Sequence, residues 1–207
     1  MAARTKRSTS AKYSRSPRSL KTPIFLSASV PNRPPYSHHS DAIAIREAIL
    51  ALVAVAARER LIVFGGHPAI SPLVEHAARS LRALHNIVIY QSRLFQSEIP
   101  IEARAFQHFH WTKSTRNRAS SLELMRFEMV RSQPFCAAVF IGGMEGVLNE
   151  CRMFKELHPQ ALLLPIASTL GAAKEIFDAG EGPDDRRIRQ KLLDNTRYRA
   201  LFRIILP

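Results

Sequence analysis

The sequence has only two cysteines and no apolar run of the roughly 18 residues that a membrane-spanning helix needs. Cys136 and Cys151 fall in a predicted buried strand and in the helix after it, which is typical of core thiols in a reducing compartment. The shortage of cysteine excludes a disulfide framework, and the shortage of long apolar runs argues against a membrane-spanning chain. We therefore expect a soluble, cytoplasmic protein without a membrane partner.

Acidic residues are missing from residues 1–21, which contain seven Lys or Arg and account for seven charges of the net +13. This segment has few large apolar residues and buries too little surface to fold alone, so we predict a disordered basic tail. Nucleic acid is one partner that such a tail would attract, and its composition also fits an organellar transit peptide. Residues 183–207 form a second basic segment, which we predict to be a C-terminal helical extension.

The remaining sequence, residues 22–207, alternates short β-rich runs with stretches that have apolar residues at helical spacing. The β-rich runs start at residues 24, 61, 86, 109, 137 and 161. This alternation predicts one Rossmann-like α/β domain, a three-layer sandwich in which a mostly parallel sheet is flanked by helices. Ligands of such sheets bind outside the carboxyl ends of the strands, so we expect the site in the turns that follow the strands.

Glycines, hydroxyls and charged side chains follow four of the predicted strands. Gly-rich turns between a strand and a helix expose backbone N–H groups to anions, so these turns predict a phosphate-containing ligand. A carboxylate in such a turn, such as Glu145, is better aimed at ribose hydroxyls than at phosphate. The predicted ligand contacts at the strand ends are Ser27, Ser29, Arg33, Gly65, Gly66, His67, Gly142, Gly143, Met144, Glu145, Gly146 and Thr169.

The spacing of the histidines does not predict a metal site. His108 and His110 alternate along one predicted strand and face the same side, but no third ligand has metal-site spacing to them. We therefore expect no metal. His67 has two interpretations that the sequence leaves open, since it either contacts the ligand or caps its own turn.

Four motifs, in the order "IFLSASVP", "VFGGHPAISPLV", "FIGGMEG" and "LPIAST", resemble the SLOG superfamily, which is named from the SMF/DprA and Lonely Guy proteins. The resemblance covers about Ile24 to Asp178. Within the superfamily, the sequence most resembles the branch found in bacterial antiviral systems. It implies a sensor of a nucleotide-derived signal, of the NAD or cyclic ADP-ribose type, that holds a ribose-phosphate ligand and no cofactor. It also implies a homo-oligomer with a TIR-type or other antiviral effector as a partner.

The Lonely Guy branch cleaves N-glycosidic bonds of nucleoside monophosphates, with the pattern Pro-Gly-Gly-x-Gly-Thr-x-x-Glu and an upstream Arg-Lys-x-x-Met. In this chain Gly142 and Gly143 match the glycine pair, and Glu150 matches the acid. The upstream pattern is altered, because Met125 falls on its arginine and Arg126 falls on its lysine. The resemblance therefore implies an incomplete catalytic pair, in which Arg126 neutralises a phosphate.

Three functions remain open from the sequence. The leading one is a binding module for a nucleotide-derived signal, and the second is a nucleotide or NAD-type N-glycosidase that uses Glu150. The third is a nucleic-acid-binding protein similar to the DprA relatives, which is disfavoured because the terminal basic segments lack interleaved aromatics. Glu150 also has a purely structural interpretation, since an acid in the first turn of a helix complements the helix dipole.

Overall fold

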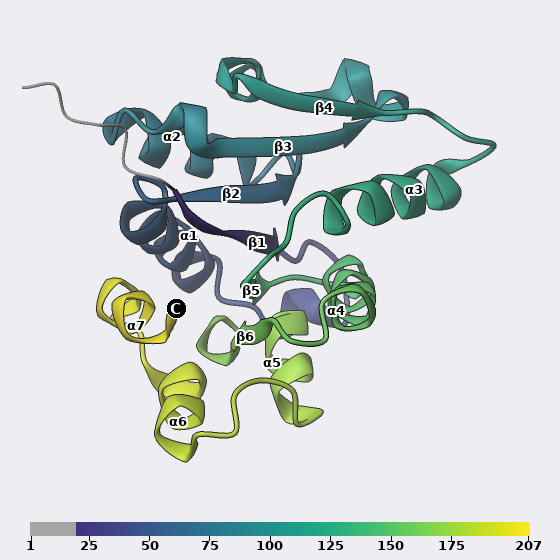
Figure 1. Cartoon of the computed structure of the whole chain (residues 1–207). Coiled ribbons are helices and arrows are strands. Elements are labelled where there is room, and N and C mark those ends of the chain that lie inside the picture. The colour runs from purple at the N-terminus through teal and green to yellow at the C-terminus, as the bar shows by residue number, and fades with distance from the viewer. Residues whose placement is uncertain (1–19) are drawn as a thin grey trace, which may run out of the picture.

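The computed structural model of the protein describes residues 20–207, apart from the side chain of His39, and shows a six-stranded sheet between two layers of helices (Figure 1). All strand pairs are parallel, and the strand order is β4-β3-β2-β1-β5-β6. The predicted Rossmann-like α/β sandwich is confirmed, and each predicted β-rich run coincides with a strand. The strands are β1 (Lys21–Ser29), β2 (Arg60–Gly65), β3 (Ile87–Ser92), β4 (His108–Thr112), β5 (Ala137–Gly142) and β6 (Leu162–Ile166).

The predicted basic tail, residues 1–21, lies outside the described residues except at its last two positions. The backbone N–H of Lys21 donates to the carbonyl of Glu59 at 2.8 Å, and β1 begins at Lys21. The sheet therefore starts one residue inside the predicted tail.

The core consists of two hydrophobic clusters, one on each face of the sheet. Side chains alternate between the faces, so that Ile24 and Leu26 of β1 enter one cluster and Phe25 enters the other. Burial on both faces explains why the central strands are nearly continuous apolar runs, as expected for a parallel sheet. β4 is the exception, because it lies at the edge of the sheet and its residues His108 and His110 are exposed.

The helices form a layer on each face of the sheet. Helices α1, α2 and α7 contribute to the cluster that contains Ile24, and helices α3, α4 and α5 contribute to the cluster that contains Phe25. The α-helices are α1 (Ala42–Ala56), α2 (Ser71–Ser80), α3 (Arg118–Val130), α4 (Glu145–Leu157), α5 (Gly171–Asp178), α6 (Arg186–Asp194) and α7 (Tyr198–Ile205). Short 3-10 helices are η1 (Tyr36–His39), η2 (Leu84–Asn86), η3 (Arg93–Glu98), η4 (Ile101–Ala105) and η5 (Ala167–Thr169).

Side chains cap some of these helices and leave others open at the amino end. The Asp41 carboxylate accepts a hydrogen bond from the Ala44 N–H at 2.8 Å at the start of α1, and the Asn117 side chain accepts one from the Ser120 N–H at 2.9 Å at the start of α3. No side chain caps the amino end of α4 or α5. Both ends lie at the carboxyl edge of the sheet, after β5 and β6, and backbone carbonyls accept part of their N–H groups: Val147 of α4 donates to Met144 at 2.8 Å, and Ala172 of α5 donates to Gly143 at 3.0 Å.

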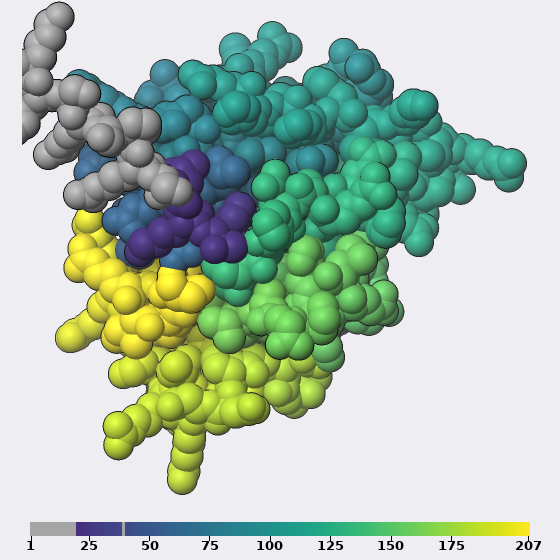
Figure 2. Space-filling model, viewed as in Figure 1, coloured from purple at the N-terminus to yellow at the C-terminus, as the bar shows by residue number. Residues whose placement is uncertain are grey.

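The predicted C-terminal extension, residues 183–207, is an integral part of the helix layer. Leu192 of α6 and Leu201 and Phe202 of α7 are fully buried in the same cluster as α1. Figure 2 shows this segment as one continuous surface with the rest of the protein. Among residues 20–207, no helix combines the length and the apolar character that a bilayer crossing requires.

Candidate functional site

The strand order reverses between β1 and β5, which lie side by side in the centre of the sheet. Ser29 at the end of β1 is opposite Gly142 at the end of β5, and the Gly143 N–H donates to the Ser29 carbonyl at 2.9 Å. In open α/β sheets this switch point is where the helices leave on opposite faces and where a crevice forms. The turns after these two strands are therefore the first place to seek a site.

The turn after β5 has a backbone that only glycine adopts easily. Gly142 and Gly143 have φ values of 56° and 93°. A Cβ at Gly142 would lie 2.4 Å from the Cδ1 atom of Ile45, and a Cβ at Gly143 would lie 2.4 Å from the Cγ2 atom of Val147. Both positions thus need glycine for conformation and for space.

The N–H groups of this glycine pair are already hydrogen-bonded inside the protein, which corrects the predicted phosphate cradle. The Gly142 N–H donates to the Thr169 hydroxyl at 2.8 Å, and the Gly143 N–H donates to Ser29. The hydroxyl of Thr169, which is fully buried, donates in turn to the Ile166 carbonyl at 2.6 Å. Thr169 was predicted as a ligand contact, but these bonds give it the role of holding the turn.

Backbone donors for an anion come instead from the start of α4. Met144 is the N-cap residue and contributes no side-chain cap, and the helix begins at Glu145. The Glu145 carboxylate accepts a hydrogen bond from Arg33 at 2.9 Å, and this bond holds the pKa of that carboxyl below its ordinary value. Glu145 therefore places its own negative charge at the amino end of the helix dipole, and Arg33 balances that charge.

A nearly buried ion pair lies behind this helix start. The Arg126 Nε donates to Glu150 Oε1 at 3.3 Å, and the Ser27 hydroxyl donates to Glu150 Oε2 at 2.5 Å. The side chains of Arg126 and Glu150 are only 17% and 13% exposed. Burial raises the pKa of the Glu150 carboxyl, and Arg126 together with the bond from Ser27 works in the opposite direction.

Two sequence-based interpretations of this pair need correction. Glu150 lies in the second turn of α4, so the helix dipole does not account for it. Glu150 also has a cation as its partner, because Arg126 reaches it while Met125 is buried in the core. Gly146 makes room for the guanidinium, since a Cβ there would lie 2.9 Å from an Arg126 Nη atom.

An open groove of about 820 Å³ runs between α3 and α4 beside this pair, and we call it the α3–α4 groove. Of the predicted contacts, Arg33, Arg126, Glu145 and Gly146 line it. Its other lining residues are Arg118, Ala119, Leu122, Glu123, Phe127, Asn149, Arg152, Met153, Glu156 and Leu157. The sequence-based prediction missed all of these. Helical periodicity was the available signal, because residues three or four positions from Arg126 and Glu145 share their helix faces.

The glycine turn after β2 lies at the same edge of the sheet but outside the α3–α4 groove. A Cβ at Gly65 would make ordinary contacts with Met125 and Met129 at 3.6 Å and 3.7 Å. The Gly66 carbonyl accepts a hydrogen bond from Gln91 at 2.6 Å. His67 accepts a hydrogen bond from the Ala69 N–H through Nδ1 at 3.2 Å, which favours the turn-capping interpretation.

The other titratable groups add no metal site among residues 20–207, where no cluster of three His, Cys, Asp or Glu side chains could hold an ion. Cys136 and Cys151 are free thiols. Burial raises the pKa of Cys151 to about 11, so this thiol is protonated at neutral pH.

Comparison with known proteins adds a family and a fold. The model of the SLOG cluster3 family matches residues 35–206. This range corrects the predicted end of the resemblance at Asp178, because it includes α6 and α7, which belong to the core. The X-ray structure of TM1055, a structural genomics target, is similar with a TM-score of 0.57 and 17% identity, over 81% of this chain and 88% of that chain. At this identity the likeness shows the fold alone. No curated protein matches the chain.

Proposed function

Because the chain belongs to the SLOG cluster3 family, we propose that it binds a nucleotide-derived ligand whose ribose-phosphate part lies at the switch point. Membership of the family supports a nucleotide-related function. The observation that carries the proposal is the nearly buried Arg126–Glu150 pair beside the open amino end of α4. The free energy needed to remove two charges from water can exceed the free energy of their mutual attraction, so a buried ion pair is weak evidence for a stabilising role. Burial also raises the pKa of the Glu150 carboxyl. Such pairs concentrate at functional sites.

The groups around the pair divide into phosphate-binding and ribose-binding sets. The first-turn N–H groups of α4 and the guanidinium groups of Arg33 and Arg126 suit a phosphate. The carboxylates of Glu145 and Glu150 suit ribose hydroxyls. In this proposal Ser27 orients the Glu150 carboxylate, and Gly146 gives Arg126 access to it.

The biological role that we propose is sensing of an NAD- or cyclic ADP-ribose-type signal in bacterial antiviral defence, in the cytoplasm. A TIR-type or other effector would be the downstream partner. A homo-oligomer is part of the proposal, because exposed Phe127 and Leu157 and half-buried Leu122 and Met153 line the α3–α4 groove. Light scattering that shows only a ~23 kDa monomer at micromolar concentration would exclude this last part.

A thermal-shift experiment tests the ligand proposal. The purified chain is incubated with NAD, AMP and cyclic ADP-ribose, and we expect at least one of them to raise the melting temperature by mass action. Arg126→Met should abolish the shift, because it removes the guanidinium and keeps the side-chain volume. Arg46→Met, on the exposed surface of α1, is the matched control and should retain it. If none of the three ligands shifts the wild type, the proposal fails.

The same pair favours one second candidate, an N-glycosidase. A carboxylate with a raised pKa beside a cation suits acid–base chemistry at a glycosidic bond. Hydrolysis would consume one water and release the free base and the ribose-containing phosphate. The sensor proposal expects no base above a no-protein control, whereas base release that Glu150→Gln removes would establish the enzyme. Nucleic-acid binding through the basic tail stays a prediction, because residues 1–19 lie outside the described residues.

A further inference from the structure

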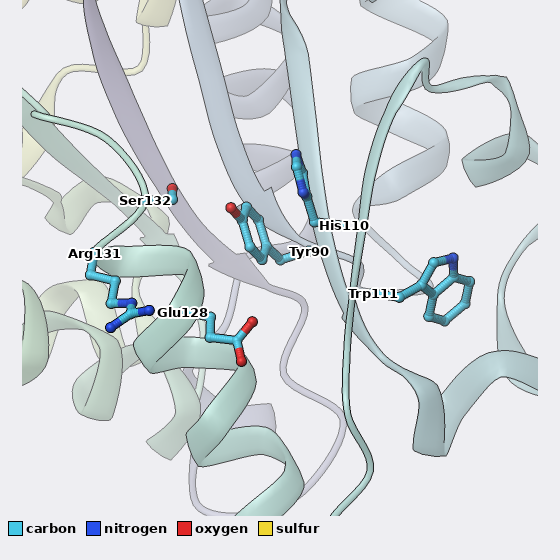
Figure 3. Close-up of a pocket in the computed structure, with 6 residues that line it drawn as sticks. All are labelled: Tyr90, His110, Trp111, Glu128, Arg131 and Ser132. Carbon is cyan, nitrogen blue, oxygen red and sulfur yellow. The ribbon is translucent and has the colours of Figure 1, made fainter.

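A second cavity, of about 570 Å³, lies at the β4 edge of the sheet and shares no lining residue with the α3–α4 groove. We call it the edge pocket, and its lining residues are Tyr90, His110, Trp111, Glu128, Arg131 and Ser132 (Figure 3). Val88 and Tyr90 of β3 join the cluster under α3, but no residue of β4 does. α3 contacts β4 as well as β3, but the buried cluster under α3 ends at β3, so one face of β4 lies outside the core.

Two stacked aromatic rings line the edge pocket on the strand side. The rings of Tyr90 and His110 are stacked, with centroids 4.8 Å apart and an interplanar angle of 14°. His110 is exposed, so its ring is accessible to a third planar group. Stacking on such a surface gives affinity for any nucleobase, because every base has a π-face, but it does not distinguish one base from another.

A carboxylate to which no described residue donates a hydrogen bond lies in the wall of the edge pocket. Glu128 is half-buried, and within the described part of the chain its carboxylate has no hydrogen-bond or ion-pair partner. Arg131, three residues later, does not pair with it, and its guanidinium lies 5.1 Å from the ring of Phe127. Figure 3 shows the Glu128 carboxylate in the space between α3 and the strands, whereas the Trp111 indole points away from it. The pocket thus offers two free acceptor oxygens.

From this combination we propose that the edge pocket binds a guanine-type base. The two oxygens of one carboxylate accept two parallel hydrogen bonds, and guanine is the common base with two adjacent donors, the ring N–H and the exocyclic amino group. Its neighbouring carbonyl oxygen is an acceptor, and Arg131 is the one arginine among the lining residues. Adenine and cytosine place a ring acceptor beside the amino group, which would face the Glu128 carboxylate with like polarity. The ring itself stacks on His110.

Equilibrium dialysis of the full chain with nucleosides tests this proposal, because nucleosides lack the phosphate that the α3–α4 groove would hold. Guanosine should bind. Inosine, which lacks the amino group, should bind at least tenfold more weakly, and adenosine more weakly still. Glu128→Gln replaces one acceptor oxygen by a donor and should weaken guanosine binding at least tenfold. Glu98→Gln, an exposed change outside both cavities, should have no effect.

Each result decides for or against the edge pocket. Far-ultraviolet circular dichroism checks that the variants fold, and His110→Ala, which removes the outer ring of the stack, replaces Glu128→Gln if that variant does not fold. Loss of guanosine binding in either variant supports the proposal. No guanosine binding to the wild type, equal binding of guanosine and adenosine, or loss of binding in Arg126→Met with retention in Glu128→Gln would each overturn it.

Discussion

The two Gly-Gly turns of the sheet have similar sequences and different structures. "VFGGHP" follows β2 and "FIGGME" follows β5, and each joins a strand to a helix. Gly142 and Gly143 have positive φ, whereas neither Gly65 nor Gly66 does. The turn after β5 also has the Arg126–Glu150 pair beside it, and the turn after β2 has methionine side chains.

The difference follows from position in the sheet and not from the glycines. β5 lies next to β1, where the strand order reverses, so its turn opens into a crevice. β2 lies between β1 and β3 on one side of that point, and its turn is closed by Gln91 and by Met125. A glycine pair after a strand therefore indicates a site only when the topology places it at the switch point.

Substitution of a glycine should give the largest difference in unfolding free energy between the two turns. Gly143→Ala should lower the free energy of unfolding by about 2–4 kcal/mol, because it combines a positive φ with a contact of 2.4 Å to Val147. Gly65→Ala should change it by about 1 kcal/mol or less, since its Cβ meets methionine atoms at ordinary distances. Urea denaturation measures both.

Gly180→Ala provides the control for this comparison. Gly180 has a φ of 88°, and a Cβ added there would meet no atom within 4 Å, so its substitution reports the cost of the positive φ alone. If Gly143→Ala is no more destabilising than Gly180→Ala, the contact with Val147 relaxes at no cost and the turn after β5 is less constrained than we infer.

Removing the side-chain hydrogen bond that holds each turn should have the next largest effect on the free energy of unfolding. Thr169→Val should lower the free energy of unfolding by about 1–3 kcal/mol, because it leaves the buried Gly142 N–H without an acceptor. Gln91→Met should cost about 1–2 kcal/mol, but most of this loss comes from the buried Ser92 N–H, which donates to the Gln91 side chain at 2.9 Å, and little comes from the half-buried Gly66 carbonyl, which solvent can hydrate. Thr169→Ser keeps the hydroxyl and is the control. Equal losses in the Ser and Val variants would assign the effect to the methyl group.

The sequence predicted the fold better than the site, and particular residues show why. All six strands follow from short β-rich runs between stretches of helical spacing, and even the weak run at Phe109 is β4. The ion pair between Arg126 and Glu150 was not predicted, because alignment to the Lonely Guy motif placed Met125, and not Arg126, on the position of the motif's arginine. The packing of α3 against β2 and β3 determines which of the two adjacent residues, Met125 or Arg126, faces the core. These tertiary contacts cannot be read from the local sequence.

The same limit explains the hydroxyl of Thr169. A threonine after a strand looks like a ligand contact in sequence, but η5 turns it inward to Gly142 and the Ile166 carbonyl. The C-terminal helices give the opposite lesson. Their positive charge led to the prediction of a basic extension. Leu192, Leu201 and Phe202 are nevertheless buried in the core, and the helical spacing of these apolar residues is the signal that could have predicted it.

Titratable groups at the two turns should also change the stability of the protein with pH in opposite directions: Glu150, beside the turn after β5, and His67, in the turn after β2. Burial raises the pKa of Glu150, so the folded chain holds this proton more tightly than the unfolded chain does. Its contribution to stability is therefore present at acid pH and is lost as the pH rises from the unfolded pKa through the folded one. Burial lowers the pKa of His67, so its contribution is present at high pH and is lost as the pH falls below the unfolded pKa.

Variants that do not titrate test these opposite slopes. Relative to the wild type, Glu150→Gln should gain stability as the pH rises above about 4, and each tenfold difference in proton affinity is worth about 1.4 kcal/mol. His67→Asn, which keeps an acceptor near Nδ1, should gain stability relative to the wild type as the pH falls below about 6.5. Urea denaturation across this pH range measures both, and a pH-independent difference for either variant would contradict the assigned burial of that group.

The smallest effect should come from the exposed ion pair that only the turn after β5 possesses. The side chains of Arg33 and Glu145 are 65% and 51% exposed, so water and salt screen their attraction. Arg33→Ala should therefore lower the free energy of unfolding by at most about 1 kcal/mol, and the loss should vanish at about 1 M salt, where the Debye length is about 3 Å. Urea denaturation at low and high salt measures it, with Arg46→Ala, another exposed arginine paired with a glutamate, as the control. A loss above about 2 kcal/mol that persists in high salt would mean that Arg33 holds the turn in place, and the turn after β5 would then depend on its charges for folding as well as for binding.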